Sequence, residues 1–257
     1  MTPAEKVLQD LGVTEPKDID LEAIAYHLGA RVRYRPLDGC EARVVGSDNA
    51  AIITVNSRSS HRRRRYSIAH ELGHWRHHRG KALVCRAEEF AVHSALSPER
   101  VADAYAADLL MPRYLFNPAA GQYPKLNFNT VNILADEFET SLTATAIRLV
   151  EGDHSPAFVI CHGINGRKWF VRAPSVPARW FPQDSLDNES FAFDVLYGRS
   201  DGTATPRKIG ADAWFDRREA ERYQVLEQTI RTGTDEILTL VLIADGEMCE
   251  DYEDRHR

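Results

Sequence analysis

The stretch His70-Glu71-Leu72-Gly73-His74 has the form HExxH, with two histidines four residues apart and a glutamate directly after the first. In an α-helix, residues i and i+4 lie about 40° apart on one face, so both imidazoles can point at one metal ion. Zinc lowers the pKa of a water molecule to about 7, and a neighbouring carboxylate can then accept its proton. The pentad therefore predicts a zinc half-site with Glu71 as general base. A surface helix that carries two histidines by chance is the alternative.

The residues around the pentad predict one long helix from about residue 60 to residue 78. On this helix Ile68, Leu72 and Trp75 form an apolar stripe at spacings i, i+4 and i+7, while the two histidines occupy another face. One face would pack on a core and the other would face a cleft, which suits a rigid but accessible metal site.

Composition restricts the class of protein. The chain has 257 residues with 43% hydrophobic and 27% charged residues, as in a globular protein of one to three domains. It has no unbroken apolar stretch near the roughly 18 residues of a membrane helix, and residues 1–12 lack the pattern of a secretory signal. Four scattered cysteines form no CxxC pair, which favours a reducing cytoplasm. A net charge of −6 argues against general binding of polyanions.

Basic residues flank the pentad, as HRRRR at 61–65 and RHHR at 76–79. A solvated helix end is one interpretation of the first run. The other is an electropositive rim that attracts an acidic peptide or nucleic acid.

The pattern along the chain predicts an α+β protein. Short helices are expected at 3–11 and 20–29, strands at 31–34, 42–45 and 51–55, and later helices at 86–94, 98–110, 128–139 and 142–151. Ser97 and Pro98 suit the N-cap and first position of the helix at 98–110. Residues 117–127 are rich in Pro, Gly and Asn and resemble a linker. Hairpins are expected at 157–172 and 223–244.

Because HExxH on a helix is typical of zinc proteases, the first predicted domain is a helix-rich metallopeptidase-like domain with a small three-stranded sheet (1–118). A helix-turn-helix-like segment (119–153) and a small α+β C-terminal domain (154–257) are expected to follow.

A catalytic zinc ion usually has three protein ligands, so a third is expected downstream. A histidine six residues after His74 is excluded, because that position is Gly80. His78 would lie about 6 Å further along the helix axis than His74. The remaining candidates are the carboxylates Glu88, Glu89, Glu99, Asp103 and Asp108.

Glu99 is favoured among these carboxylates, because the spacing to Asp103 places both on one helix face. One carboxylate can bind metal while the other accepts a hydrogen bond from a ligating histidine. A first-turn carboxylate that only stabilises its helix is the alternative.

The run YSIAHELGH at 66–74, with ExxAD-x-YAA-x-LLMP at 99–112, resembles the ImmA/IrrE metallopeptidase family. Asp103 replaces the usual Asn and Tyr105 the usual Phe, and the resemblance covers residues 1–118. It implies that His70, His74 and Glu99 bind zinc and that Glu71 is the general base, with Asp103 keeping the acceptor role. Manganese or another divalent ion could occupy a looser site. A donor to the oxyanion is also needed, and Tyr66, Tyr105, Tyr114, His77 and His93 are candidates of which none is favoured.

Residues 134–138 and 141–149 resemble a helix-turn-helix, a segment often found in that family. Arg148 and several threonines are its only groups suited to DNA, so a packing role is favoured over contact with nucleic acid. The C-terminal domain is rich in aromatic residues, which usually form a core. By analogy with one family branch it would be a GAF-like sensor or partner-binding domain.

The resemblance implies a cytoplasmic zinc endopeptidase of narrow specificity. Its protein substrate would be a helix-turn-helix repressor, whose cleavage derepresses stress-response or mobile-element genes. Two alternatives belong to other classes: a DNA-binding regulator with a structural or sensory zinc site, and a toxin–antitoxin or phage-immunity partner that acts by protein binding.

Overall fold

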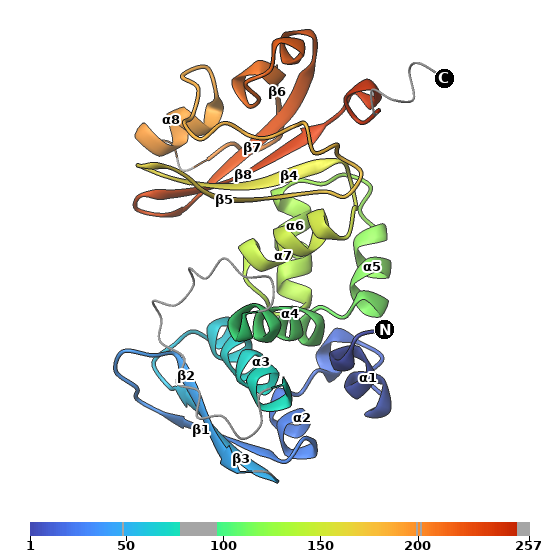
Figure 1. Cartoon of the computed structure of the whole chain (residues 1–257), viewed down its shortest axis with the longest axis vertical. Helices are drawn as coiled ribbons and strands as arrows, with labels where there is room; N and C mark the ends of the chain where they lie inside the picture. The colour runs from blue at the N-terminus through green and yellow to red at the C-terminus, as the bar shows by residue number, and fades with distance from the viewer. Residues whose placement is uncertain (48, 78–96, 199, 201, 251–257) are drawn as a thin grey trace. The chain divides into compact units, whose positions relative to one another are not determined.

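The computed structural model describes residues 1–47, 49–77, 97–198, 200 and 202–250. The fold is α+β, as predicted, and the chain divides into two compact units (Figure 1). The first unit comprises Met1–Ala119 with Ala135–Ser141, and the second comprises Ala120–Leu134 with the residues from Leu142 onward. The three-part division expected from the sequence stays a prediction.

The first unit combines helices with a three-stranded sheet. Its helices are α1 (Pro3–Asp10), η1 (Pro16–Asp18), α2 (Leu21–His27), α3 (His61–His77), α4 (Pro98–Leu110) and most of α5 (Arg113–Gly121). Its strands are β1 (Ala30–Arg35), β2 (Ala42–Ser47) and β3 (Ala50–Asn56), in the order β1-β3-β2. The central strand β3 is parallel to β1 and antiparallel to β2.

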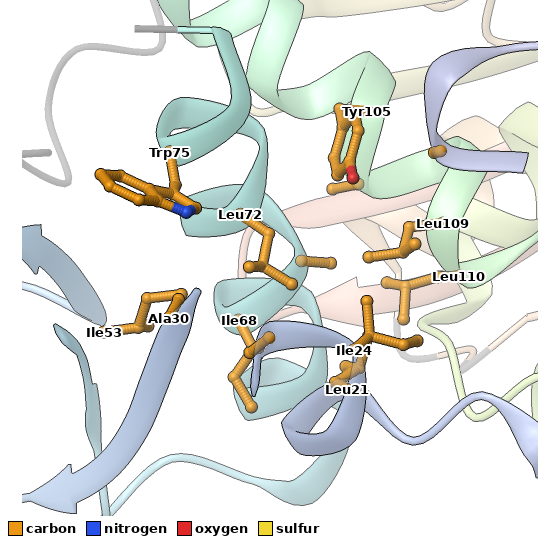
Figure 2. Packing of buried hydrophobic residues seen from close by; sticks show 14 of the residues in the cluster. Leu21, Ile24, Ala30, Ile53, Ile68, Leu72, Trp75, Tyr105, Leu109 and Leu110 are labelled. Carbon is orange, nitrogen blue, oxygen red and sulfur yellow. The ribbon is translucent and has the colours of Figure 1, made fainter. Parts of the chain in front are cut away.

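The apolar stripe of α3 packs into the core of this unit (Figure 2). Ile68, Leu72 and Trp75 are at most 4% exposed and lie beside core residues from α2, the sheet and α4. Burial of a side chain of this size stabilises a fold by roughly 1.5–3 kcal/mol. The indole N–H of Trp75 also donates to the carbonyl of Leu28 at 2.8 Å. These contacts hold α3 in one orientation, and with it the histidines on its other face.

The second unit is built on a five-stranded antiparallel sheet with the order β5-β4-β8-β7-β6. The strands are β4 (Ala157–Gly163), β5 (Gly166–Arg172), β6 (Arg207–Gly210), β7 (Gln224–Gly233) and β8 (Glu236–Ile243). Helix α7 (Leu142–Glu151) packs on β4 and β5, and α8 (Phe191–Tyr197) packs on β7 and β8. The two helices lie on opposite faces of the sheet (Figure 1). Helix α6 (Phe128–Glu137) contributes its residues up to Leu134 to the second unit and the rest to the first. The second unit also contains the short helices η2 (Ala211–Ala213), η3 (Arg218–Arg222) and η4 (Gly246–Met248).

Several predicted elements are confirmed and others need correction. The three strands of the first unit, both predicted hairpins and the helices at α3, α4, α6 and α7 are present within a few residues of the expected bounds. The predicted linker at 117–127 is wrong for residues 117–121, because α5 continues through Pro118 to Gly121, whereas residues 122–127 form no helix or strand. Phe116, Ala119 and Ala120 are buried, so tertiary packing outweighs the helix-breaking tendency of proline. The helix expected at 86–94 lies outside the described residues.

No described helix is both long enough and apolar enough to cross a membrane.

Candidate metal centre

Helices α3 and α4 approach each other closely at Gly73. A Cβ atom at this position would lie 2.8 Å from the Cα atom of Ala102 and 3.0 Å from its carbonyl oxygen. Only glycine permits this approach without a displacement of the backbone. The glycine inside HExxH therefore allows α4 to reach the helix that carries the histidines.

The start of α4 places Glu99 beside that contact. Ser97 caps the helix by accepting a hydrogen bond from the backbone N–H of Arg100 at 3.3 Å, and Pro98 occupies the first helical position. Glu99 thus lies in the first turn of α4, with its side chain 26% exposed.

Three side-chain donors meet between the two helices. The Nε2 atoms of His70 and His74 are 3.0 Å apart, and Glu99 places one carboxylate oxygen 3.1 Å from the first and the other 3.3 Å from the second. Ligands at 2.0–2.1 Å from a tetrahedral ion are about 3.3 Å apart, which these separations match. The donor set of two imidazoles and a carboxylate therefore fits a divalent metal ion.

The other ring nitrogen of His70 is held by Asp103 on α4. His70 Nδ1 lies 2.8 Å from Asp103 Oδ1, and the hydroxyl of Tyr66 donates to the same oxygen. If Nδ1 carries the proton, then Nε2 presents its lone pair to the metal position.

Burial and hydrogen bonds oppose each other in setting the pKa values of this group. Burial acts to lower the pKa of His70, but the hydrogen bond to Asp103 and the surrounding carboxylates outweigh it, and the pKa is raised. Burial acts to raise the pKa of Asp103, but the hydrogen bonds from His70 and Tyr66 prevail and lower it. Burial, together with the charge of Asp103, raises the pKa of Tyr66. These directions agree with an ionised Asp103 that accepts two hydrogen bonds.

Glu71 is 2% exposed, and its charge helps to raise the pKa of His70. The glutamate of the pentad is therefore close enough to His70 for its charge to act on that imidazole. His74 is also buried, at 1% exposed.

The other residues considered from the sequence have different surroundings. The ring of Tyr105 packs in the core at 5.6 Å from the ring of His77, and the hydroxyl of Tyr114 donates to the carbonyl of Val13. Asp108 is not part of the donor group found among the described residues. His78, Glu88, Glu89 and His93 lie outside the described residues.

The contact between Tyr66 and Asp103 was missed by the sequence reasoning. Tyr66 lies one helical turn before His70, which was a usable signal, but the partner of its hydroxyl follows only from the placement of α4.

The basic run at the start of α3 lies against acidic and aromatic partners. Arg62 pairs with Asp136, while His61 and Arg65 approach Glu139 at 3.3 and 3.2 Å. Of the remaining two, Arg63 is 3.9 Å from Glu41 and Arg64 lies over the ring of Tyr34. These acidic partners reduce the free positive charge that an electropositive rim would need.

A helix that carries HExxH and packs against a second helix with a third donor defines a metallopeptidase-like domain. Residues 25–150 match the family model described as the IrrE N-terminal-like domain (Peptidase M78), so this part of the chain belongs to the ImmA/IrrE family. The fold is similar to the solved structure of a Mycobacterium tuberculosis transcriptional regulator, with 13% sequence identity and a TM-score of 0.63. The similarity covers 95% of this chain and 76% of that one, and at this identity it concerns the fold alone. No curated protein matches the sequence.

Proposed function

We propose that this protein is a zinc-dependent endopeptidase of narrow specificity. The observation that carries the proposal is the donor set of His70, His74 and Glu99, together with the buried Glu71, whose charge acts on His70. Two imidazoles and one carboxylate are the ligands of a catalytic zinc site that keeps one position open. Manganese or another divalent ion is compatible with the same donors.

The residues of the site have separate roles in this proposal. His70, His74 and Glu99 hold the ion, and Asp103 fixes the orientation of His70. When bound, zinc supplies Lewis-acid polarisation of a peptide carbonyl and lowers the pKa of a water molecule. Glu71 accepts the proton of the attacking water and transfers it to the leaving amine.

We further propose that the substrate is a helix-turn-helix transcriptional repressor, whose cleavage derepresses stress-response or mobile-element genes. Membership of a peptidase family supports a protein as substrate. The choice of a repressor rests on the resemblance to the ImmA/IrrE family.

The test combines metal analysis with a cleavage assay on the purified full chain. After co-expression with a repressor encoded by a neighbouring gene, mass spectrometry should find one defined cleavage in that repressor. Glu71→Gln should keep the metal and lose cleavage, because the ligands remain and the proton acceptor is gone. His70→Ala should lose the metal as well. Glu137→Gln, a change at an exposed position of α6, is the matched control and should behave as the parent.

Two results would contradict the proposal. Cleavage by Glu71→Gln at the parental rate would exclude the role of this glutamate. Binding to DNA that weakens steeply with salt, in a chain that cleaves nothing, would instead support a DNA-binding regulator. The structure offers little for the latter, since Arg148 on α7 is only 5% exposed and the helix packs on the five-stranded sheet.

A further inference from the structure

Tyr66 and His70 converge on one atom of the neighbouring helix. They lie one turn apart on α3, and the Tyr66 hydroxyl and His70 Nδ1 both form hydrogen bonds with Oδ1 of Asp103. The ring of Tyr66 also lies near Arg63, whose guanidinium carbon is 5.5 Å from the ring centroid, and near the His70 ring, whose centroid is 5.8 Å away. A tyrosine, a carboxylate and a metal-site histidine thus form a continuous chain.

We infer that Tyr66 is a positioning residue for the metal site, acting on His70 through Asp103. This inference rests on the proposed function, because it assigns Tyr66 a task only if His70 binds the metal. Tyr66 is not a catalytic residue in this view, since its hydroxyl has a single proton and donates it to Asp103.

The need for such a residue follows from the exposure of Asp103. Its side chain is 38% exposed, so a single hydrogen bond to His70 leaves the carboxylate free to turn toward water. The second donor from the same face of α3 restricts the carboxylate to the rotamer that meets His70 Nδ1. Groups that orient a ligating histidine in this way raise metal affinity, and their loss typically costs about 10- to 100-fold.

A tyrosine near a zinc site can also stabilise the oxyanion of the substrate. The direction of the Tyr66 hydroxyl argues against this second role. That role requires a hydroxyl aimed at the substrate carbonyl. The Tyr66 hydroxyl is directed at the carboxylate behind His70 instead.

The test measures zinc affinity of the full chain by competition with a chromophoric chelator, with no substrate present. Tyr66→Phe removes one oxygen atom and should weaken zinc binding by about 3- to 10-fold, less than the loss of a group that contacts the ligand directly. Tyr114→Phe is the matched control, because that hydroxyl belongs to the same unit and donates to the carbonyl of Val13. It should bind zinc as the parent does.

A double-variant cycle shows whether Tyr66 acts through Asp103. Asp103→Ala should weaken zinc binding by about 10- to 100-fold. Addition of Tyr66→Phe to Asp103→Ala should then have no further effect, because the intermediary is absent. Thermal unfolding in excess chelator measures the stability of the metal-free variants. If Tyr66 had only a structural role, Tyr66→Phe would lower this stability and leave the zinc affinity unchanged.

The outcomes separate this inference from the proposed function. If the parent binds zinc and cleaves its substrate but Tyr66→Phe binds zinc like Tyr114→Phe, the positioning role is wrong and the peptidase proposal stands. Additive effects in the double variant would also overturn the role. A parent chain that binds no divalent metal would overturn both.

Discussion

Glu227 on β7 is a fully buried carboxylate in the second unit, at 0% exposed. It accepts hydrogen bonds from the backbone N–H of Ala192 at 2.6 Å, the indole of Trp214 at 2.9 Å and the hydroxyl of Thr229 at 3.2 Å. Burial raises its pKa, although these hydrogen bonds oppose the shift. One residue thus joins a strand, the first turn of α8 and a core tryptophan.

Replacement of Glu227 by alanine should destabilise the second unit by about 3–5 kcal/mol, because buried donors lose their acceptor and a cavity forms. The measurement is urea unfolding followed by tryptophan fluorescence. Glu236→Ala is the control on the adjacent strand. Its ion pair with Lys168 is solvent-exposed, so its loss should change stability by no more than about 1 kcal/mol. Equal effects of the two changes would show that Glu227 has no special part in the core.

Individual functional residues could be predicted from the sequence only where they are a few positions apart in one helix. The HExxH spacing and the Glu99–Asp103 spacing lie within single helices, and the structure brings Glu99 to the two histidines. Nothing comparable marks Glu227, since its partners at 192 and 214 are distant in sequence and approach only in the folded sheet. Short-range periodicity contains no information on such contacts.

Among the elements, the contact of α3 with α4 determines the geometry of the metal centre. Gly73 is its critical position, because an added Cβ would lie 2.8 Å from a backbone atom of Ala102 that cannot turn aside. The helices would have to separate, and Glu99 would move away from the histidines with α4.

Gly73→Ala should therefore weaken zinc binding by at least 10-fold and cost about 1–3 kcal/mol of stability through overpacking. Chelator competition and urea unfolding measure the two effects. Gly121→Ala, at the end of α5, is the matched control, because an added Cβ there meets no atom within 4 Å. Parental zinc affinity in Gly73→Ala would show that the helix separation does not set the donor geometry.

Helices and strands with clear patterns could be predicted, including the N-cap at Ser97 and both hairpins of the second unit. Strand β6 and helix α8 were not predicted, and β6 has only four residues, which provide too little periodicity. The partners of the basic run could not be predicted either, because Asp136 and Glu139 follow it by more than 70 residues.

For the whole molecule, the sequence pattern predicted an α+β chain. The two compact units are not two consecutive segments of the chain, because each contains two separate stretches of sequence. Residues 135–141 group with the first unit although the residues before and after them belong to the second. The grouping of residues 135–141 with the first unit depends on tertiary contacts. One of them is the packing of Phe138 on Phe116, whose ring centroids are 5.2 Å apart. A change in composition along the chain cannot reveal it.

The second unit should lose stability in acid, because its strand β4 carries the buried His162. It is 0% exposed and its ring contacts Trp214 at 5.9 Å. Burial lowers its pKa to about 4, and the charge of Arg167 acts in the same direction, while the nearby backbone of Gln183 and the charge of Asp184 oppose it. The unfolded chain therefore binds a proton at this residue near pH 6.5, whereas the folded chain binds it only near pH 4. Between these values the unfolded state holds more protons, so stability must fall as the pH falls.

The loss should reach at most about 3 kcal/mol at pH 4, from 1.36 kcal/mol per unit of pKa shift. Urea unfolding of the parent and of His162→Leu from pH 7 to pH 4 measures it. The two proteins share every other titrating group, including His70 with its raised pKa, so the difference between their profiles isolates His162. The difference should be constant above pH 7 and should shift in favour of the leucine variant as the pH falls below 6.5. Parallel profiles over the whole range would mean that His162 takes up its proton without a cost to the folded state, and that the acid sensitivity of the second unit lies elsewhere.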